Sequence, residues 1–166
     1  MNAIAIDMVG LDELQWSWAQ APDIARAELA AAMTEADSLL EREVKEATPT
    51  AHGLLRGSIF GVEEVSATQV LGVVGTAMQH AIPVELGSKP HFPPIEPLID
   101  WVRVKLGITG DKEAKGVAFA IARTIASRGT LGVGMFHRTF ARLQPQLNAI
   151  FARARDRIVA RLAGKA

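Results

Sequence analysis

The side chains that could carry chemistry in this chain are, first of all, its histidines. The sequence has His52, His80, His91 and His137, and no two of them show the His-Glu-x-x-His spacing that places two metal ligands on one helix face. His80 and Glu85 can meet only if the backbone between them folds suitably, and a hydrogen-bonded histidine near a loop is the simpler interpretation. We therefore predict no metal site and no bound cofactor.

A glycine-rich stretch and three further polar positions also lack the patterns of catalytic sites. Residues 129–134 miss the Gly-Lys-Ser/Thr ending of a phosphate-binding loop, and a predicted helix rather than a strand precedes them. Ser58 stands in no Gly-x-Ser-x-Gly nucleophile elbow. Glu63 and Glu64 are adjacent in a predicted strand, so their side chains point to opposite faces. We expect the protein not to be an enzyme, and a hydrolase with an unrecognised site is the alternative.

Near the C-terminal end, Arg153, Arg157 and Arg161 recur at intervals of four and share one face of a predicted helix. Such a face could bind phosphates, which would make the chain a small nucleic-acid-binding protein. Aromatic side chains that stack on bases are absent beside this face. A basic face turned to solvent or to a protein partner is the favoured interpretation, and nucleic-acid binding is the alternative.

Length and composition limit the class of protein. The chain has 166 residues, 49% of them hydrophobic, which suits a single globular domain with a core. It has no cysteine, so a disulfide-stabilised fold and a thiolate metal site are both excluded. The first residues lack the basic start of a signal peptide, and charged residues interrupt every long apolar run. We therefore expect neither a signal peptide nor a membrane span.

Charge is distributed unevenly along a chain whose net charge is zero. Residues 1–100 contain 15 Asp and Glu against 5 Lys and Arg, and residues 101–166 contain 3 against 13. This asymmetry suits a nucleic-acid patch at one end, complementary faces of neighbouring subunits, or two solvated surfaces of opposite sign. Composition leaves these three interpretations open.

The first part of the chain is predicted to be mainly helical. A short strand is expected over residues 2–9, a short helix over 11–20, and a longer helix over 23–47 that begins just after Pro22. The long helix is predicted because apolar residues recur at steps of three and four, at Leu29, Met33, Ala36, Leu40, Val44 and Ala47.

The middle of the chain is predicted to be a β-hairpin flanked by turns. A structured turn over residues 50–57 precedes two runs rich in Val, Ile and Phe, at 58–65 and 69–76, which we expect to pair antiparallel. Residues 80–85 fit a third strand or a short helix equally well. Four prolines between residues 86 and 97 predict a stiff, extended loop.

The remainder of the chain is predicted to be helical again. A helix over residues 98–106 should end at the following glycine, and Asp111 should cap a helix over 112–127. The glycine-rich stretch is expected to be a loop. A last helix is expected from about 135 to 162, with a kink or a break at Pro145.

Two segments carry a family resemblance. Residues 48–59 are Thr-Pro-Thr-Ala-His-Gly-Leu-Leu-Arg-Gly-Ser-Ile, and residues 80–87 are His-Ala-Ile-Pro-Val-Glu-Leu-Gly. In this order, after a long amphipathic helix and around a valine-rich hairpin, they resemble the motifs of the phage tail-completion proteins, the neck family described as gene-ten-like or minor-tail-protein-Z-like. The matching positions are Pro49, Gly53, Leu55, Arg56, Ser58 and Ile59 in the first segment and Ala81, Val84, Glu85 and Gly87 in the second.

The resemblance implies an α+β fold in which a small antiparallel β-sheet is packed by a long N-terminal helix and a long C-terminal helix. It implies one domain over residues 1–166, with an inserted helical segment at about 96–127. It also implies a structural virion protein that forms a ring, hexameric as in that family, between the head connector or stopper and the tail terminator or tail-tube proteins. DNA would pass through the lumen without sequence readout. The protein would lie in the virion neck, touch no membrane, and assemble in the host cytoplasm.

Three surfaces are candidates for contacts in such an assembly, and one ion pair is a candidate link between the motifs. The surfaces are the stiff loop, the glycine-rich loop and the basic face: Ser88, Lys89, Pro90, His91, Phe92 and Pro93; Gly129, Thr130, Leu131 and Gly132; Arg153, Arg157 and Arg161. Arg56 and Glu85 come from the two motifs and have opposite charges, so we predict that they pair. Of Trp16 and Trp18, we expect one to pack in the core and the other to face a partner.

Overall fold

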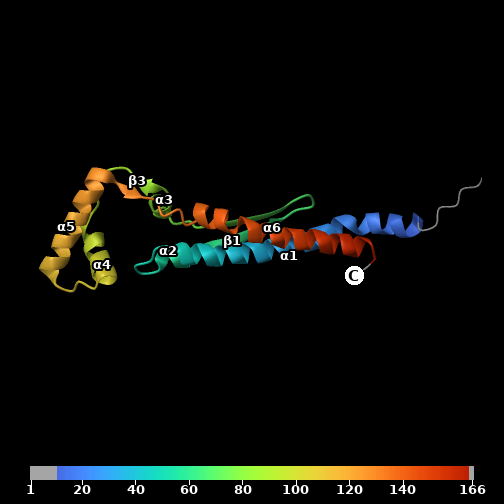
Figure 1. Cartoon of the computed structure of the whole chain (residues 1–166), viewed down its shortest axis with the longest axis horizontal. Helices are drawn as coiled ribbons and strands as arrows, with labels where there is room; N and C mark the ends of the chain where they lie inside the picture. The colour runs from blue at the N-terminus through green and yellow to red at the C-terminus, as the bar shows by residue number, and fades with distance from the viewer. Residues whose placement is uncertain (1–10, 165–166) are drawn as a thin grey trace, which may run out of the picture. The chain divides into compact units, whose positions relative to one another are not determined.

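The computed structural model describes residues 11–164 and combines helices with short strands (Figure 1). The predicted strand over residues 2–9 lies outside the described residues. A long first helix, a long last helix and a small antiparallel sheet confirm the predicted α+β class. The elements are, in chain order, α1 (Leu11–Ala47), α2 (Leu54–Gly57), β1 (Phe60–Val65), β2 (Val70–Gly75), α3 (Ala81–Leu86), β3 (Gly87–Ser88), α4 (Ile95–Leu106), α5 (Asp111–Arg128), β4 (Thr130–Leu131) and α6 (His137–Leu162).

The backbone groups into two compact units. Unit 1 comprises residues 1–37, 62–73 and 144–166, and unit 2 comprises residues 38–61 and 74–143. Each unit contains part of α1, part of the β1–β2 hairpin and part of α6. The expectation of one domain over the whole chain stays a prediction.

Helix α1 is one continuous helix, so the predicted new start after Pro22 is wrong. A proline inside a helix removes a backbone hydrogen bond and costs about 3 kcal/mol. Alanine, the strongest helix former, surrounds it at positions 19, 21, 25, 27 and 30–32, and this helical preference offsets the local cost. The helix ends at Ala47, shortly before Pro49, as the sequence predicted.

Strands β1 and β2 form a two-stranded sheet, as predicted. Residues 66–69 turn the chain, and the first of them donates its amide to the carbonyl of the last at 2.8 Å. Within unit 1 the hairpin lies against α1, where the Thr34 hydroxyl donates to Glu63 Oε2 at 3.0 Å. A Cβ on Gly72 would stand 2.2 Å from a carboxylate oxygen of Asp37. The hairpin therefore turns Glu63 and Gly72 toward α1.

The core of unit 2 forms where α1, α2 and α3 meet the segment that leads into α6. Its buried residues are Val44, Leu55, Ile59, Ala81 and Met135. Residues 81–86 are helical, which decides between the strand and the helix expected there. Helix α3 turns Ala81 into this core and packs Val84 against it, while Ile82 and Leu86 stay exposed.

Helices α4 and α5 pack against each other within unit 2. Val102, Ala114 and Ala118 are completely buried between them. The larger α5 residues Val117 and Ile121 pack at the border of this cluster, and alanines occupy its centre. The small alanine side chains allow the two helices to approach closely. Gly107 ends α4 with a φ of +68°, as expected for a helix C-terminus.

Two predicted boundaries in this region are wrong. Helix α4 begins at Ile95, three residues early, because its first turn tolerates Pro97. The predicted cap of α5 is also not formed. Gly110 is the residue before the helix and Asp111 is its first residue, where the carboxylate contacts Arg103 instead of a backbone amide.

The predicted glycine-rich loop contains a short strand, because β4 pairs antiparallel with β3. Gly87 lies opposite Leu131, and Ser88 lies opposite Thr130. Helix α6 then begins at His137 and continues to Leu162 without the predicted break at its internal proline, whose ring is exposed. Of the described helices, none has both the length and the apolar run that a membrane crossing requires.

Two tryptophans near the start of α1 are exposed. Trp16 and Trp18 expose 63% and 72% of their surface, so the expectation that one packs in the core is wrong. Among the described residues, the first hydrogen bonds from α1 to its neighbours in unit 1 lie further along the chain, at Arg26 and Glu28. Two aromatic side chains so close together in water are available for contacts with a partner.

Candidate assembly surface

Glu85, the acidic residue of the second motif, binds the beginning of α6. Its carboxylate oxygens accept the backbone amides of Phe136 and His137, each at 2.9 Å. Amides in the first turn of a helix have no partner within the helix, and the helix N-terminus carries partial positive charge. A carboxylate is therefore favoured at this position, and Glu85 fastens α3 to α6.

The predicted ion pair between Arg56 and Glu85 is wrong. Both carboxylate oxygens of Glu85 are occupied by backbone donors, and Arg56 on α2 has an exposed side chain. The amide of Phe136 lies 51 residues beyond Glu85, so the position of α6, not the two motifs, decides which donors reach this carboxylate.

Two glycines allow the two predicted contact loops to meet. A Cβ on Gly87 would stand 2.3 Å from the carbonyl oxygen of Thr130, and a Cβ on Gly129 would stand 2.0 Å from the carbonyl oxygen of Ser88. Both glycines have positive φ, at +83° and +72°, which other residues rarely adopt. The hydroxyls of Ser88 and Thr130 lie 2.9 Å apart across the pair of strands. The second motif thus ends where the two chain segments touch.

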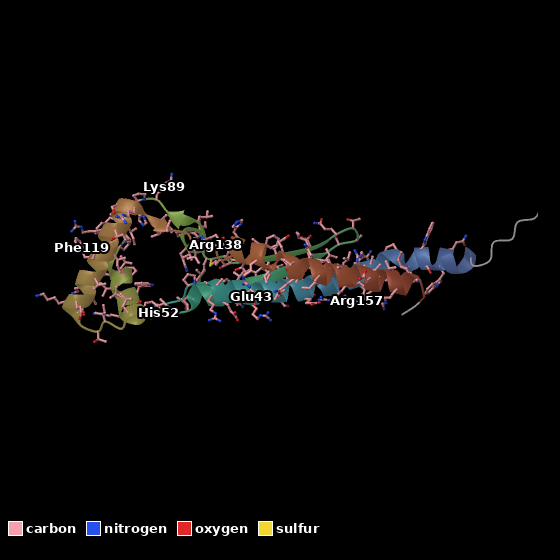
Figure 2. The ribbon with its side chains drawn as sticks, viewed as in Figure 1. Glu43, His52, Lys89, Phe119, Arg138 and Arg157 are labelled. Carbon is pink, nitrogen blue, oxygen red and sulfur yellow. The ribbon has the colours of Figure 1, made fainter. Side chains whose placement is uncertain are left out.

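The remaining residues of the stiff loop are mostly exposed. His91 Nδ1 lies 2.9 Å from the carbonyl oxygen of Lys89, which keeps the loop turned on itself. The ring of Phe92 packs edge to face on Phe119 of α5, with 6.0 Å between the ring centroids. Lys89, Pro90, His91 and Phe92 are exposed, and Pro93 is half-buried (Figure 2 labels Lys89 and Phe119).

Large apolar side chains are exposed around the β3–β4 pair. Leu131 on β4 is 96% exposed, Leu86 at the end of α3 is 77% exposed, and Ile82 is 63% exposed. Ile82 and Leu86 border an open hollow of about 470 Å³, whose other apolar walls include Met78 and Phe136. We name this region the α3–β4 corner, defined by Ile82, Leu86 and Leu131. The corner thus combines an apolar hollow with exposed apolar side chains.

The first motif builds the turn between α1 and β1. Gly53 has a φ of +80°, a conformation that suits glycine, and Leu55 and Ile59 are buried in the core of unit 2. The Ser58 hydroxyl donates to the Leu55 carbonyl at 2.8 Å and lies 2.7 Å from the hydroxyl of Thr76. The matched residues with buried or hydrogen-bonded side chains therefore shape the fold.

A histidine–carboxylate pair that the sequence did not predict joins the first motif to α4. His52 Nε2 lies 2.6 Å from Asp100 Oδ2, and the side chains are 52% and 60% exposed (His52 is labelled in Figure 2). The residues are 48 positions apart, so no local spacing signals the pair. Such a pair is part of nucleophilic triads, but in residues 11–164 no hydroxyl is hydrogen-bonded to the His52 ring. No three potential metal ligands gather in that range either.

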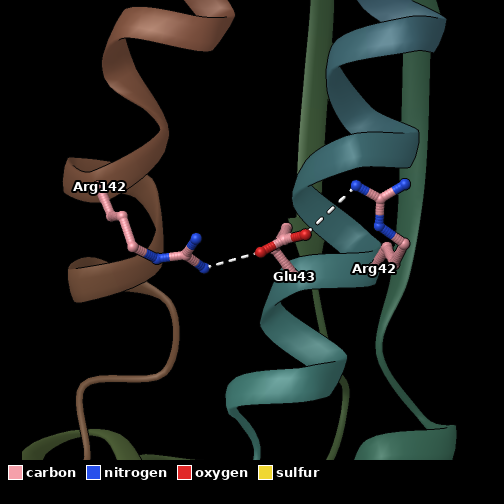
Figure 3. Close-up of polar contacts among 3 residues, drawn as sticks. All are labelled: Arg42, Glu43 and Arg142. Carbon is pink, nitrogen blue, oxygen red and sulfur yellow. Dashed lines mark hydrogen bonds and ion pairs between the residues drawn. The ribbon is translucent and has the colours of Figure 1, made fainter.

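Within unit 2, Glu43 bridges two arginines on different elements (Figure 3). Glu43 of α1 accepts from Arg142 of α6 at 2.8 Å and from its neighbour Arg42 at 3.2 Å. The hydrogen bond from Arg142, then that from Arg42, lowers the pKa of the Glu43 carboxyl. The bridge links the C-terminal part of α1 to the first turns of α6.

Neither a family model, nor a curated protein, nor a solved structure matches this chain. The tail-completion family therefore stays a resemblance that the two motif segments carry. Function can be inferred from the α3–β4 corner and from the two sides of α1 in unit 1, one facing α6 and the other facing the hairpin.

The predicted basic face of α6 is occupied by carboxylates of α1 within unit 1. Arg153 donates to Glu35 at 2.6 Å, and Arg157 and Arg161 donate to Glu28 at 2.6 Å and 3.0 Å. The hydrogen bond from Arg157 is the largest cause that lowers the pKa of Glu28 (Figure 2 labels Arg157). The three arginines thus hold α6 on α1, and opposite charges that the sequence places in different halves meet in one chain.

A different side of α1 lies beneath the hairpin, and its polar groups are poorly satisfied. Asp37 is only 8% exposed, and its Oδ2 has no hydrogen-bond partner. Burial raises the pKa of Asp37, and the nearby negative charge of Glu63 raises it further. Gly72 covers this carboxyl so closely that no side chain fits between them. The hairpin is therefore seated on an uncompensated acidic group.

Proposed function

We propose that this chain is a structural subunit of the neck of a tailed bacteriophage, a ring-forming tail-completion protein that joins head and tail around the DNA channel. The ring is hexameric, as the family resemblance implies, and lies between the head connector and the tail terminator or tail-tube proteins. DNA passes through the lumen without sequence readout.

The α3–β4 corner is the observation that carries this proposal. Its leucines project into water beside an apolar hollow, and apolar groups in such an arrangement gain free energy when another protein covers them. The motif residues Glu85 and Gly87 build this corner, by capping α6 and by letting β3 approach β4. In the proposed role the motifs serve to present an assembly surface, and they need no catalytic group.

The experiment removes the chain from the phage that encodes it. A nonsense mutation in the gene should yield filled heads and separate tails under the electron microscope, and a plasmid-borne wild-type copy should restore joined particles. Infectious particles with intact necks in the absence of the chain would refute the proposal.

A paired substitution links the result to the corner. The double variant Leu86→Asp/Leu131→Asp should fold, because both side chains are exposed, yet should fail to restore joining. Val159→Asp is the matched control, because Val159 is 60% exposed on α6 in unit 1. It should restore joining as well as the wild type does.

Nucleic-acid binding through the basic face is the weaker alternative. Each of the three arginines already donates to a carboxylate of α1, so a phosphate would have to displace that carboxylate. Tight DNA binding by the isolated chain that falls steeply with salt, and that is lost in Arg157→Gln, would favour this alternative.

A further inference from the structure

The β1–β2 hairpin exposes an apolar side within unit 1, opposite the side that carries Glu63 and Gly72 and faces α1. Glu63 and Gly72 turn toward α1, so alternation along each strand turns the neighbouring residues outward. The outward residues are Val62, Glu64, Leu71 and Val73, which we name the outer hairpin face. The three apolar members are 53%, 42% and 55% exposed, and Glu64 is also exposed.

Both edges of this sheet are open as well. The sheet contains only β1 and β2 among the described residues, so each strand has one row of backbone groups without a neighbouring strand. A two-stranded hairpin is marginally stable by itself and gains from a surface that covers its apolar side. Its contact with α1 does not cover Val62, Leu71 and Val73, because these residues point away from that helix.

A surface of matching chemistry lies on α5 in unit 2. Phe119 is 51% exposed, and residues of the following turns of the helix line a shallow hollow of about 460 Å³. The hollow is lined by Ala120, Arg123, Thr124, Ser127 and Arg128, whose small members leave room for another protein's side chains. Arg123 and Arg128 form no ion pair with any other described residue. We name Phe119 and these five residues the α5 face.

The net charges of the two units are also opposite, with the acidic unit carrying the outer hairpin face and the basic unit carrying the α5 face. Unit 1 contains ten Asp and Glu against six Lys and Arg, and unit 2 contains eight against twelve, so their net charges are −4 and +4. Unit 1 of one copy therefore attracts unit 2 of another copy. The outer hairpin face offers apolar groups with a carboxylate, and the α5 face offers apolar groups with guanidinium groups.

We propose that the outer hairpin face of one copy docks on the α5 face of a second copy of this chain, with Glu64 pairing to Arg123. The contact joins two different patches, so each copy keeps one patch for the next, and repetition gives a ring where the rotation closes. This proposal rests on the ring assembly proposed above and names the surfaces that form it.

A second copy fits these surfaces better than DNA does. Glu64 repels phosphates, and valine and leucine side chains at a strand surface offer no hydrogen bond to a nucleotide. A protein partner also explains why the hairpin and the α5 face carry opposite charges, whereas DNA would account for the α5 face alone.

Charge reversal provides the first test. Sedimentation velocity at low ionic strength should show assembly of the wild-type chain. Glu64→Arg and Arg123→Glu should each raise the concentration needed for half assembly at least about tenfold, because each places like charges together. The double variant Glu64→Arg/Arg123→Glu should restore assembly to within about threefold of the wild type.

Matched controls separate this contact from net charge. Glu46→Arg and Lys112→Glu make the same changes at exposed positions that lie outside both surfaces, and they should leave assembly unchanged. If Glu64→Arg and Arg123→Glu each assemble into rings as well as the wild type does, the docking contact is overturned, and the proposed neck function still stands. Loss of DNA binding rather than of assembly in Arg123→Glu would also overturn it.

The absence of cysteine from the chain permits a second test that does not depend on charge. Chains with Val73→Cys and chains with Thr124→Cys, mixed and oxidised, should form a disulfide dimer that neither variant forms alone. A chain with both substitutions should give a ladder of cross-linked oligomers. Dimers of Val73→Cys alone would show that two hairpins face each other, and no dimer in the mixture would show that the surfaces do not meet; either result overturns the proposal.

Discussion

Within unit 1, helix α1 presents carboxylates to two neighbours, α6 and the β1–β2 hairpin, and it treats them differently. Toward α6, Glu28 and Glu35 accept from three arginines. Toward the hairpin, Asp37 is buried with an oxygen that lacks a partner, and the facing strand brings Glu63 rather than a cation. The carboxylates on the α6 side of the helix are paired with cations, and the carboxyl on the hairpin side is not.

The difference indicates which contact is permanent. Satisfied polar networks make a unique packing, whereas a buried polar group without a partner lowers the stability of the contact that buries it. Sequences tend to break such local rules at functional positions. We infer that the ion pairs between α6 and α1 serve the fold. We also infer that the unfavourable contact between the hairpin and α1 is retained because the hairpin docks on the α5 face of another copy.

The largest expected effect comes from wedging α1 away from α6. Ala32 is completely buried and lies between Glu28 and Glu35 on the side of α1 that faces α6. Ala32→Leu should lower the free energy of unfolding by about 3 kcal/mol, because a closely packed interface cannot take the added volume. Urea denaturation measures the change. Ala27→Leu, at an exposed position of α1, should cost less than about 0.5 kcal/mol, and equal losses would refute this packing.

A smaller loss is expected when the hairpin is pushed off its seat. Gly72→Ala places a methyl group where an oxygen of Asp37 lies, 2.2 Å from the ideal position, and should cost about 2 kcal/mol. Adding Asp37→Ala should recover most of that loss, because the obstructing carboxyl is gone. Strictly additive effects in this double-mutant cycle would show that the two residues do not touch.

Removing the unpaired carboxyl on the hairpin side of α1 should increase the stability of the protein at neutral pH. Asp37→Ala should raise the free energy of unfolding by about 1 kcal/mol, because it removes a buried carboxylate oxygen that lacks a partner. The folded protein raises the pKa of Asp37 above its ordinary 3.8. The wild-type carboxyl therefore favours folding most fully below pH 3.8 and loses that contribution as the pH rises through the folded pKa.

A pH series of urea titrations checks this sign. The gain from Asp37→Ala should be present at neutral pH and should shrink on acidification toward pH 3.8. Asp37→Asn, which keeps the shape and removes the charge, is the control that isolates charge. A gain that is independent of pH would refute the assignment to ionised Asp37.

The smallest effect is expected on the α6 side of the helix. Glu28 has a lowered pKa, chiefly because Arg157 donates to it, so its contribution is present above its ordinary pKa of 4.5 and is lost as the pH falls through the folded pKa. Glu28→Gln should lower the melting temperature slightly at neutral pH, less than either packing variant does. High salt should reduce the difference, since exposed ion pairs are screened. A larger loss in high salt than in low salt would contradict this account.

The two long helices and the hairpin could be predicted from sequence because their signals are local. Apolar residues at steps of three and four place one side of α1 and α6 in a core, and two valine-rich runs separated by a polar turn pair as a hairpin. The same local reasoning failed at Pro22, where a proline suggested a helix start but a run of alanines kept the helix continuous. Boundaries depend on such competition between neighbours.

The partners of the charged residues could not be predicted in this way. Glu85 was expected to meet Arg56 because both belong to the motifs, but the start of α6 reaches it first. The arginines of α6 were expected to face solvent or a partner, and in unit 1 they meet carboxylates more than a hundred residues earlier in the chain. The glycine-rich loop became a strand only because β3 lies beside it.

What the amino-acid sequence determined by itself is the long helices and the β1–β2 hairpin, together with the segments that resemble the tail-completion motifs, since these depend on spacing within a few residues. Only the tertiary structure decided which charges pair, which carboxyl is buried without a partner, and which side of the hairpin faces water. Those outcomes depend on the register between elements far apart in the chain, and a change of one residue in that register would turn each side chain toward a different neighbour.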